Sequence, residues 1–352
     1  MLNKTDILSL DLTELSDFLA KLSEEKGVKI EKFRAKQIYT WLHMGVSSFS
    51  EMTNISKTIR ELLDENCYIA LPQVEKKLVS AIDGTVKYLF RLYDGECVES
   101  VFMRYEHGNT VCISSQAGCR MGCRFCASTI AGFTRNLTPS EILGQVIAAG
   151  KDTGERVSNI VMMGIGEPLD NFDNVIKFLE LVNSPEGLNI GYRHISLSTC
   201  GIVPKILELS KKNLPLTLSI SLHSTTQEKR EHLMPIAKKY SIEELIGACK
   251  QYINEGGRRI SFEYTMIEGE NDSEEDATRL AKLLSGMLCH VNLIPLNTVD
   301  GRDYRKSGKA AIQKFVSVLE KRGITATVRR RLGSDIDASC GQLRASKIEE
   351  QA

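Results

Sequence analysis

The stretch CISSQAGCRMGCRFCAST (112–129) joins a predicted strand to a loop that holds three closely spaced cysteines. Cys119, Cys123 and Cys126 are separated by three and then by two other residues. Clustered soft thiolates favour zinc or an iron–sulfur cluster. Structural zinc usually takes four ligands from two separated cysteine pairs, and the second pair is missing from this loop. The spacing therefore predicts a 4Fe–4S cluster held by three cysteines, which leaves one iron open to a small molecule.

Two further cysteines suggest chemistry outside this loop. Cys112 is the nearest candidate for a fourth ligand, but it lies within a strand pattern rather than in the loop, so it is a poor one. Cys340 lies in DIDASCGQL (335–343), a polar segment that contains glycine. A thiol in such a setting is a candidate nucleophile. We therefore assign residues 336–352 to a C-terminal segment that carries a functional cysteine.

From about residue 108 the chain alternates apolar strand patterns with helical ones. The strand candidates are TVCIS (110–114), NIVMMG (159–164), HISLST (194–199), LTLSISLH (216–223), RISFEYTMI (259–267), HVNLIPLN (290–297) and ITATVRR (324–330). Thr138, Pro139 and Glu141 predict a helix start with a capping box. Such alternation predicts an α/β fold with a parallel sheet covered by helices. About six strand–helix units predict an incomplete (βα)6-type barrel, with its chemistry at the carboxyl ends of the strands.

Residues 1–72 predict a helical accessory domain. Leu15, Leu19 and Leu22 recur at helical spacing in a first helix, a second helix would carry Trp41, and Ser56 is the predicted N-cap of a third. The segment KIEKFRAKQ (29–37) adds a cluster of basic side chains. Such clusters are usually solvated faces, but a basic helix also suits contacts with RNA phosphates.

Residues 73–104 alternate apolar and polar side chains, which is typical of strands. Two Asp-Gly pairs, at 83–84 and 94–95, are hairpin turn signals because glycine accepts the positive φ that these turns need. The segment therefore predicts a small β-hairpin element that leads into a core barrel over residues 105–335.

The composition indicates a globular protein of 352 residues, of which 42% are hydrophobic and 26% are charged. The chain has no apolar run of about 18 residues, and its first residues lack the features of an export signal. We expect a cytoplasmic monomer that does not bind membranes. In such a chain the ten cysteines are better explained as ligands, nucleophiles or buried residues than as disulfides. A formal net charge of zero argues against wholesale electrostatic binding to nucleic acid, but it allows local basic patches.

Polar residues end several of the predicted strands. The stretch GIGEPLDN contains a glycine-rich turn, and its Glu167 can accept a hydrogen bond from an ammonium group. Ser198, Ser221, His223 and Asn297 end further strands. Each alone is as simply explained as a polar loop residue. Together on one rim they predict a binding site.

The CxxxCxxC spacing, with Phe125 before the last cysteine, resembles the radical S-adenosylmethionine (SAM) superfamily. The GIGE turn is similar to the GGE-type motif with which the superfamily binds the SAM amino group. Superfamily members bind SAM on the open iron and cleave it reductively to a 5′-deoxyadenosyl radical. The cofactor then carries the difficult chemistry, and the protein orients it.

Longer motifs resemble one family of this superfamily, the RlmN family, over nearly the whole chain. They are FRAKQIYTWLH (33–43), CISSQAGCRMGCRFCAST (112–129), GFTRNLTPSEILGQV (132–146), MMGIGEPLDN (162–171), SLHS (221–224), LMPI (233–236), HVNLIPLN (290–297) and DIDASCGQL (335–343). The family methylates C2 of adenosine 2503 in 23S rRNA and of adenosine 37 in tRNAs. The resemblance therefore implies 23S rRNA and tRNA as partners. It also implies an external electron donor such as flavodoxin or ferredoxin.

The resemblance implies roles for individual residues. Cys119, Cys123 and Cys126 would hold the cluster. The residues implied in SAM binding are Gly166, Glu167, Ser198, Ser221, Leu222, His223 and Asn297.

It also implies a use of two SAM molecules per turnover. One would methylate Cys340, and the other would give the radical that takes a hydrogen atom from that methyl group. Glu99 would be the proton acceptor. Cys112 would attack the Cys340 sulfur, and the transient disulfide would release the methylated base.

The chemistry of adenine agrees with this scheme. C2 is an electron-poor carbon without a lone pair to attack SAM, so a polar methyl transfer fails there. A radical route needs a cluster, and a covalent methyl carrier needs a free thiol. The base must also leave its stack to enter a barrel mouth. The stretch VRRRL (328–332) could then hold the RNA backbone.

Two alternatives stay open. A Cfr-type enzyme methylates C8 of the same rRNA adenosine; the GEPL and LIPLN stretches favour C2, because Cfr-type sequences carry alanine after GE and lack the proline of LIP. The second alternative is a non-catalytic iron–sulfur or zinc protein that binds RNA. Such a protein would not require Cys112, Cys340 and the polar strand ends together.

Overall fold

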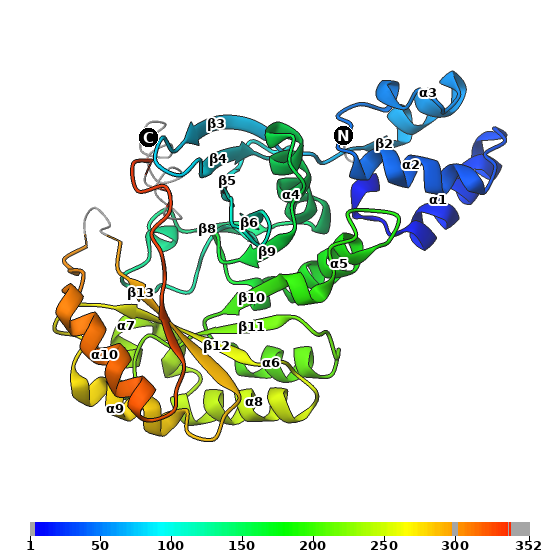
Figure 1. The fold of residues 1–352 in the computed structure, drawn as a ribbon. Helices are drawn as coiled ribbons and strands as arrows, with labels where there is room; N and C mark the ends of the chain where they lie inside the picture. The colour runs from blue at the N-terminus through cyan, green and yellow to red at the C-terminus, as the bar shows by residue number, and fades with distance from the viewer. Residues whose placement is uncertain (1–3, 298–301, 337, 339–352) are drawn as a thin grey trace.

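The computed structural model describes residues 4–297, 302–336 and 338 (Figure 1). Its centre is a run of parallel strands. They are β6 (Thr110–Cys112), β9 (Asn159–Met162), β10 (Ile195–Thr199), β11 (Thr217–Ser221), β12 (Ile260–Met266), β13 (Cys289–Pro295) and β14 (Ala326–Val328). Each strand pairs in parallel with the next one of this series. All seven predicted strands are therefore confirmed, within a few residues of their predicted ends.

Helices connect these strands and cover one face of the sheet (Figure 1). They are α4 (Pro139–Thr153), α5 (Phe172–Asn183), α6 (Val203–Ser210), α7 (Gln227–Leu233), α8 (Ile242–Asn254), α9 (Glu274–Leu283) and α10 (Lys309–Lys321). The predicted capping box of α4 is present, with Thr138 as N-cap and Glu141 bonded back to it. None of the described helices is long and apolar enough to cross a lipid bilayer.

An antiparallel extension continues the sheet beyond β6. It consists of β3 (Gln73–Val79), β4 (Val86–Arg91) and β5 (Cys97–Met103), and β5 pairs with β6. Both predicted turns are confirmed, and Gly84 and Gly95 have φ of 71° and 93°. The ten strands form one sheet in which, over the described residues, β14 and β3 each pair with a single neighbour. The barrel is therefore incomplete, as predicted.

The strand register separates two kinds of side chain. Leu197 and Leu218 are paired positions that belong to the apolar core shared with the helices. The next paired positions, Ser198 and Ser219, point to the opposite face. Glu263 shares that face, because it lies two residues after the partner of Ser219. The sheet is thus apolar toward its helices and largely polar toward the inside of the barrel, where a ligand can bind.

A short ribbon that the sequence did not reveal closes the cysteine loop. It pairs β7 (Gln116–Gly118) with β8 (Phe133–Asn136). Gly118 has a φ of 81°, and a Cβ built on it would lie 1.9 Å from the carbonyl oxygen of Gly132. Only glycine fits this close crossing of two backbones. The ribbon therefore fixes both ends of the loop that carries the cysteines.

The N-terminal part contains the three predicted helices, α1 (Leu12–Lys26), α2 (Phe33–His43) and α3 (Lys57–Asn66), together with the short pair β1 (Thr5–Asp6) and β2 (Cys67–Tyr68). Ser56 caps α3 by accepting from the Ile59 N–H, as predicted. The helices dock on the barrel through Lys177 of α5, whose Nζ lies 2.6 Å from carboxylate oxygens of Asp11 and Glu14. This part lies at one end of the molecule, away from α9 and α10 (Figure 1).

Candidate active site

The three cysteines of the CxxxCxxC loop line one cavity at the carboxyl ends of the parallel strands. This cavity, of about 210 Å³, is termed the cysteine cavity and is lined by Cys119, Cys123 and Cys126 together with residues from β10, β11 and β12. The loop is tied to the end of α7, because the Arg124 N–H donates to the Leu233 carbonyl at 3.0 Å. The predicted metal ligands are thus brought together where a parallel barrel places its chemistry.

The donor set fits an iron–sulfur cluster. Burial raises the pKa of the Cys119 thiol to about 12 and that of Cys123 well above its ordinary value, and the charge of the nearby Cys126 adds to both. Such thiols become thiolates when they bind a metal. No three His, Cys, Asp or Glu side chains of the described chain converge as ligands of a single ion. A 4Fe–4S cluster takes each cysteine on a different iron, so three separate thiols around one cavity can hold it.

The glycine-rich turn after β9 presents a carboxylate to the same cavity. Gly166 has a φ of 106°, and a Cβ there would lie 2.6 Å from the Cβ of Gln116. Glu167 is buried and accepts backbone hydrogen bonds from Leu169 at 3.0 Å and Cys200 at 2.7 Å. A carboxylate offers about four lone-pair sites, so a fixed Glu167 can still accept an ammonium group. Burial raises its pKa, which a cationic ligand would oppose.

His223 follows β11 in a left-handed conformation, with a φ of 54°. Burial lowers its pKa to about 3, so the ring is neutral. Its Nδ1 accepts from the Thr265 N–H at 3.0 Å, which leaves the proton on Nε2 as a donor. Phe125 of the cysteine loop meets the ring edge-on, with centroids 5.0 Å apart. The aromatic residue singled out in the sequence therefore joins the loop to the end of β11.

The predicted SAM residues do not all lie in one place. Five of them line the cysteine cavity: Gly166, Glu167, Ser198, Ser221 and His223. The Leu222 side chain is fully buried in the apolar core, and its N–H donates to the Glu263 carbonyl at 3.1 Å. Asn297 lines a neighbouring cavity instead.

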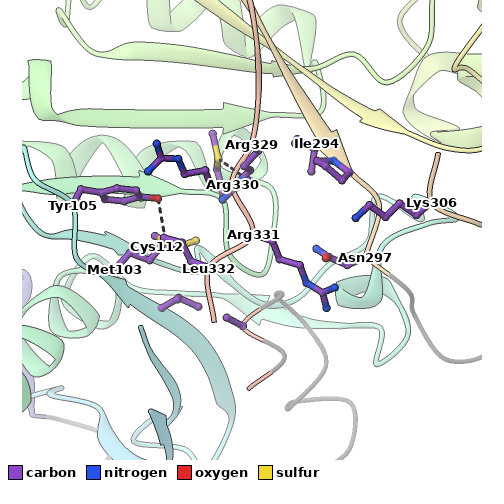
Figure 2. Close-up of a pocket in the computed structure, with 14 residues that line it drawn as sticks. Met103, Tyr105, Cys112, Ile294, Asn297, Lys306, Arg329, Arg330, Arg331 and Leu332 are labelled. Carbon is purple, nitrogen blue, oxygen red and sulfur yellow. Dashed lines mark hydrogen bonds between the residues drawn. The ribbon is translucent and has the colours of Figure 1, made fainter. Parts of the chain in front are cut away.

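That second cavity, of about 310 Å³, is termed the Cys112 cavity (Figure 2). Cys112 lies at the end of β6, and in the close-up it lies beside Met103, whose sulfur accepts from the Tyr105 hydroxyl at 3.7 Å. Met163, Ile294 and Arg329 line both cavities, so the two adjoin. The cationic side chains around the Cys112 cavity are Lys306, Arg329, Arg330 and Arg331. A cavity with a thiol and a basic rim suits a polyanionic substrate.

Glu99 lies in the sheet beside this cavity and lines neither space. It is on β5, and its carbonyl accepts from the Ser114 hydroxyl at 2.7 Å. Its Oε2 lies 3.1 Å from Nζ of Lys87 on β4, and both side chains are completely inaccessible to solvent. The burial of Lys87 was not predictable from the sequence, because a lysine in an alternating strand suggests a solvent-facing position.

Glu263 is a second buried carboxylate that the sequence analysis missed. It lines the cysteine cavity and accepts from the Ser261 hydroxyl at 2.8 Å and the Asn292 amide at 2.6 Å. Burial raises its pKa. The signal was present in the sequence, since Glu263 interrupts the apolar strand ISFEYTM at an inward position.

Cys340 lies outside the described residues. The described chain reaches the Cys112 cavity at Ala338, two residues before Cys340 in the sequence. The preceding segment is fixed on the turn between β3 and β4. Asp335 accepts from the Ser80 hydroxyl at 2.6 Å and the Ala81 N–H at 2.8 Å, and the Gly333 N–H donates to Asp83 at 2.8 Å.

Comparison with known proteins identifies the family. Residues 113–281 match the radical SAM superfamily, and residues 5–69 match the ribosomal RNA large subunit methyltransferase N-terminal domain. A probable dual-specificity RNA methyltransferase RlmN from Clostridium botulinum (strain Eklund 17B / Type B) is 54% identical over 346 residues, 98% of either chain. The chain belongs to the RlmN family. Its relative from Alkaliphilus oremlandii (strain OhILAs), of the same name, is 52% identical over 99% of this chain and 100% of that one.

The fold agrees with this membership. A crystal structure of a radical SAM methyltransferase from Sphaerobacter thermophilus superposes with a TM-score of 0.91, at 40% identity over 96% of this chain and 98% of that one. Membership of the RlmN family within the radical SAM superfamily implies a 4Fe–4S cluster and SAM as cofactors.

Proposed function

We propose that this protein methylates C2 of adenosine 2503 in 23S rRNA and of adenosine 37 in tRNAs by radical SAM chemistry. One observation carries the proposal: the Cys112 cavity adjoins the cavity lined by the three cluster cysteines. A thiol in the floor of a basic cavity, next to a site for a radical-generating cofactor, suits a reaction that passes through a protein thioether. The relatives named as dual-specificity RNA methyltransferases support the choice of substrate.

The cysteine cavity supplies the groups for cofactor binding. Cys119, Cys123 and Cys126 would hold the cluster, and Glu167 would accept from the SAM ammonium group. The backbone at Leu222 and the side chains of Ser198, Ser221, His223 and Asn297 would complete the SAM site. When bound, the cluster and SAM would supply a 5′-deoxyadenosyl radical, which would take a hydrogen atom from a methyl group on Cys340. That methyl group would come from another SAM molecule by displacement, with release of S-adenosylhomocysteine and the thiol proton, so each turnover would use two.

The protein residues then complete the transfer. The methylene carbon on the Cys340 sulfur bonds to C2, and the unpaired electron of the ring passes to a one-electron acceptor of the iron–sulfur or flavin class. The C2 proton goes to Glu99. The Cys112 thiolate attacks the Cys340 sulfur, so that an S–S bond forms and the S–C bond breaks. The electron pair of the broken bond stays with carbon, which takes a proton to become the methyl group.

Partners follow from this chemistry. An external reductant such as flavodoxin or ferredoxin supplies the electrons for SAM cleavage and for reducing the disulfide. RNA phosphates contact the basic rim of the Cys112 cavity, and the target base leaves its stack to enter it. We further propose that the protein acts in the cytoplasm as a monomer. Cys340, which lies beyond the described chain, is the proposed methyl carrier.

The decisive experiment is mass spectrometry of RNA from cells that lack this protein. Loss of 2-methyladenosine from 23S rRNA and tRNA, restored by the gene on a plasmid, is the expected result. Loss of 8-methyladenosine would favour the Cfr-type reaction instead. Unchanged RNA would contradict both.

A second experiment separates the enzyme from a non-catalytic iron–sulfur or zinc protein that binds RNA. Anaerobically reconstituted protein should bind one 4Fe–4S cluster whose spectrum changes on addition of SAM. The Cys112→Ala variant should accumulate a covalent RNA–protein adduct, because the resolving thiol is gone. Cys249→Ala, at a buried position on α8, is the matched control and should accumulate none. Normal turnover of Cys112→Ala would refute the two-cysteine step.

A further inference from the structure

A completely buried ion pair lies in the sheet beside the Cys112 cavity. Nζ of Lys87 on β4 is 3.1 Å from Oε2 of Glu99 on β5, and neither side chain has any exposed surface. Lysine and glutamate are among the residues least often fully buried in proteins. Burying such a pair removes both charges from water, and this cost can exceed their mutual attraction. Stability alone is therefore a weak explanation for the pair.

The strand register places the pair and Cys112 on one face. Lys87 pairs with Val101 of β5, and Val101 pairs with Cys112 of β6, so these three side chains form a row across three strands. Glu99 precedes Val101 by two residues and shares its face. It is thus the diagonal neighbour of Lys87 and of Cys112, at about 7–8 Å between Cα atoms in such a ladder.

Glu99 is also fixed from the other side. Its carbonyl accepts from the Ser114 hydroxyl, which in turn accepts from the Ile165 N–H at 2.9 Å. Ile165 belongs to the glycine-rich turn that carries Glu167 into the cysteine cavity. The backbone of Glu99 is therefore held by the same loops that shape the proposed cofactor site.

We infer that Lys87 is a positioning residue, whose ammonium group holds the Glu99 carboxylate on the face of the sheet that carries Cys112. The inference rests on the proposed function. When the methylene carbon on Cys340 is bonded to C2 of the adenine, the C2–H bond must break. The proton goes to the Glu99 carboxylate, which becomes a carboxylic acid, and the electron pair of the bond stays in the ring. Lys87 takes no part in this proton transfer and acts only by holding the carboxylate in place.

Lys87→Met removes the ammonium group that lies 3.1 Å from Oε2 of Glu99, so the carboxylate loses the contact that holds it beside Cys112. Lys87→Met should therefore slow RNA methylation by about 100-fold or more, the range of general base catalysis. Methylation of Cys340 does not involve Glu99 and should proceed as in the wild type. Lys87→Arg keeps a cation and should recover most of the RNA methylation.

The test measures three products anaerobically for each reconstituted variant: methylated Cys340 by mass spectrometry, 5′-deoxyadenosine, and methylated RNA. Lys77→Met is the matched control, because Lys77 of β3 also forms an ion pair, with Asp152 at 2.5 Å, but it is partly exposed and lies on the opposite face of the sheet, since it pairs with Tyr88. It should methylate RNA like the wild type. Wild-type RNA methylation by folded Lys87→Met, or failure of folded Lys87→Arg to exceed it, would overturn the inference.

A double variant covers the case in which Lys87→Met does not fold. Lys87→Met/Glu99→Gln removes both charges and avoids an unpaired buried one. If Lys87 acts through Glu99, the double variant should retain the same residual single-turnover rate as Glu99→Gln. A further loss of tenfold or more would mean that Lys87 acts elsewhere. A wild-type protein that methylates Cys340 but never RNA would instead refute the proposed function itself.

Discussion

Replacing Gly118 by alanine tests whether the β7–β8 ribbon positions the cluster loop. A left-handed conformation such as the φ of 81° at Gly118 costs a residue with a Cβ about 1–2 kcal/mol. The new Cβ would also lie 1.9 Å from the Gly132 oxygen, where ordinary contact begins at 3.4 Å, so one backbone must move by about 1.5 Å. Overpacking of this kind adds about 1–3 kcal/mol. The same oxygen accepts from the Cys119 N–H, so the shift reaches a cluster ligand directly.

Gly132→Ala is the matched control. Gly132 is also left-handed, with a φ of 66°, but a Cβ there has no neighbour within 4 Å. It should cost only about 1–2 kcal/mol in the free energy of unfolding and leave iron binding intact. Gly118→Ala should lose about 2–5 kcal/mol and bind much less iron. The assays are urea unfolding and iron content after anaerobic reconstitution. Equal iron binding and equal stability in the two variants would refute the reasoning.

The remaining predictions concern three other parts of the molecule. Burial lowers the pKa of His43 to about 4 from its ordinary 6.5. Between these two pH values the unfolded chain binds a proton at His43 and the folded chain does not, so the free energy of unfolding falls as the pH drops below 6.5. Between pH 7 and 5 the wild type should lose about 2 kcal/mol more unfolding free energy than His43→Gln, and parallel curves would contradict this. Asp335→Asn weakens the hydrogen bonds that fix the segment before Cys340 to Ser80 and Ala81. RNA methylation should therefore slow severalfold while cluster binding stays normal. A parallel loss of iron would contradict a role of Asp335 in holding this segment. RNA affinity measured at several salt concentrations gives a slope of log K against log salt. Arg330→Ala should reduce the size of this slope by about one, whereas Lys321→Ala, at the end of α10, should leave it unchanged.

Much of the fold could be predicted from local features of the sequence. The seven parallel strands, the three N-terminal helices and the caps at Ser56 and Thr138 were all predictable, because each depends on periodicity or on a few adjacent residues. The β7–β8 ribbon was not predictable. Its strands have three and four residues and pair across the cysteine loop, and such short segments carry almost no periodic signal.

The candidate site also has a part that could be predicted from the sequence and a part that could not. The spacing of Cys119, Cys123 and Cys126 was enough to predict a cluster, since its ligands come from one loop. The two buried carboxylate environments, around Glu99 and Glu263, could not be predicted in this way. Glu99 depends on Lys87, 12 residues away, and Glu263 depends on Asn292, 29 residues away; each partner lies on a neighbouring strand.

The sequence by itself determined the family, the cofactor class and the order of strands, because motifs and periodicity are local properties of the chain. Only the tertiary structure decided which polar groups are buried and what they face. Burial of a charge depends on both faces of the sheet being covered, and β5 is buried at every position although its sequence includes Glu99 and Ser100. Lys87 shows the consequence. A lysine in a strand suggests a side chain that faces solvent, but Lys87 lies diagonal to Glu99 in the ladder and pairs with its buried carboxylate.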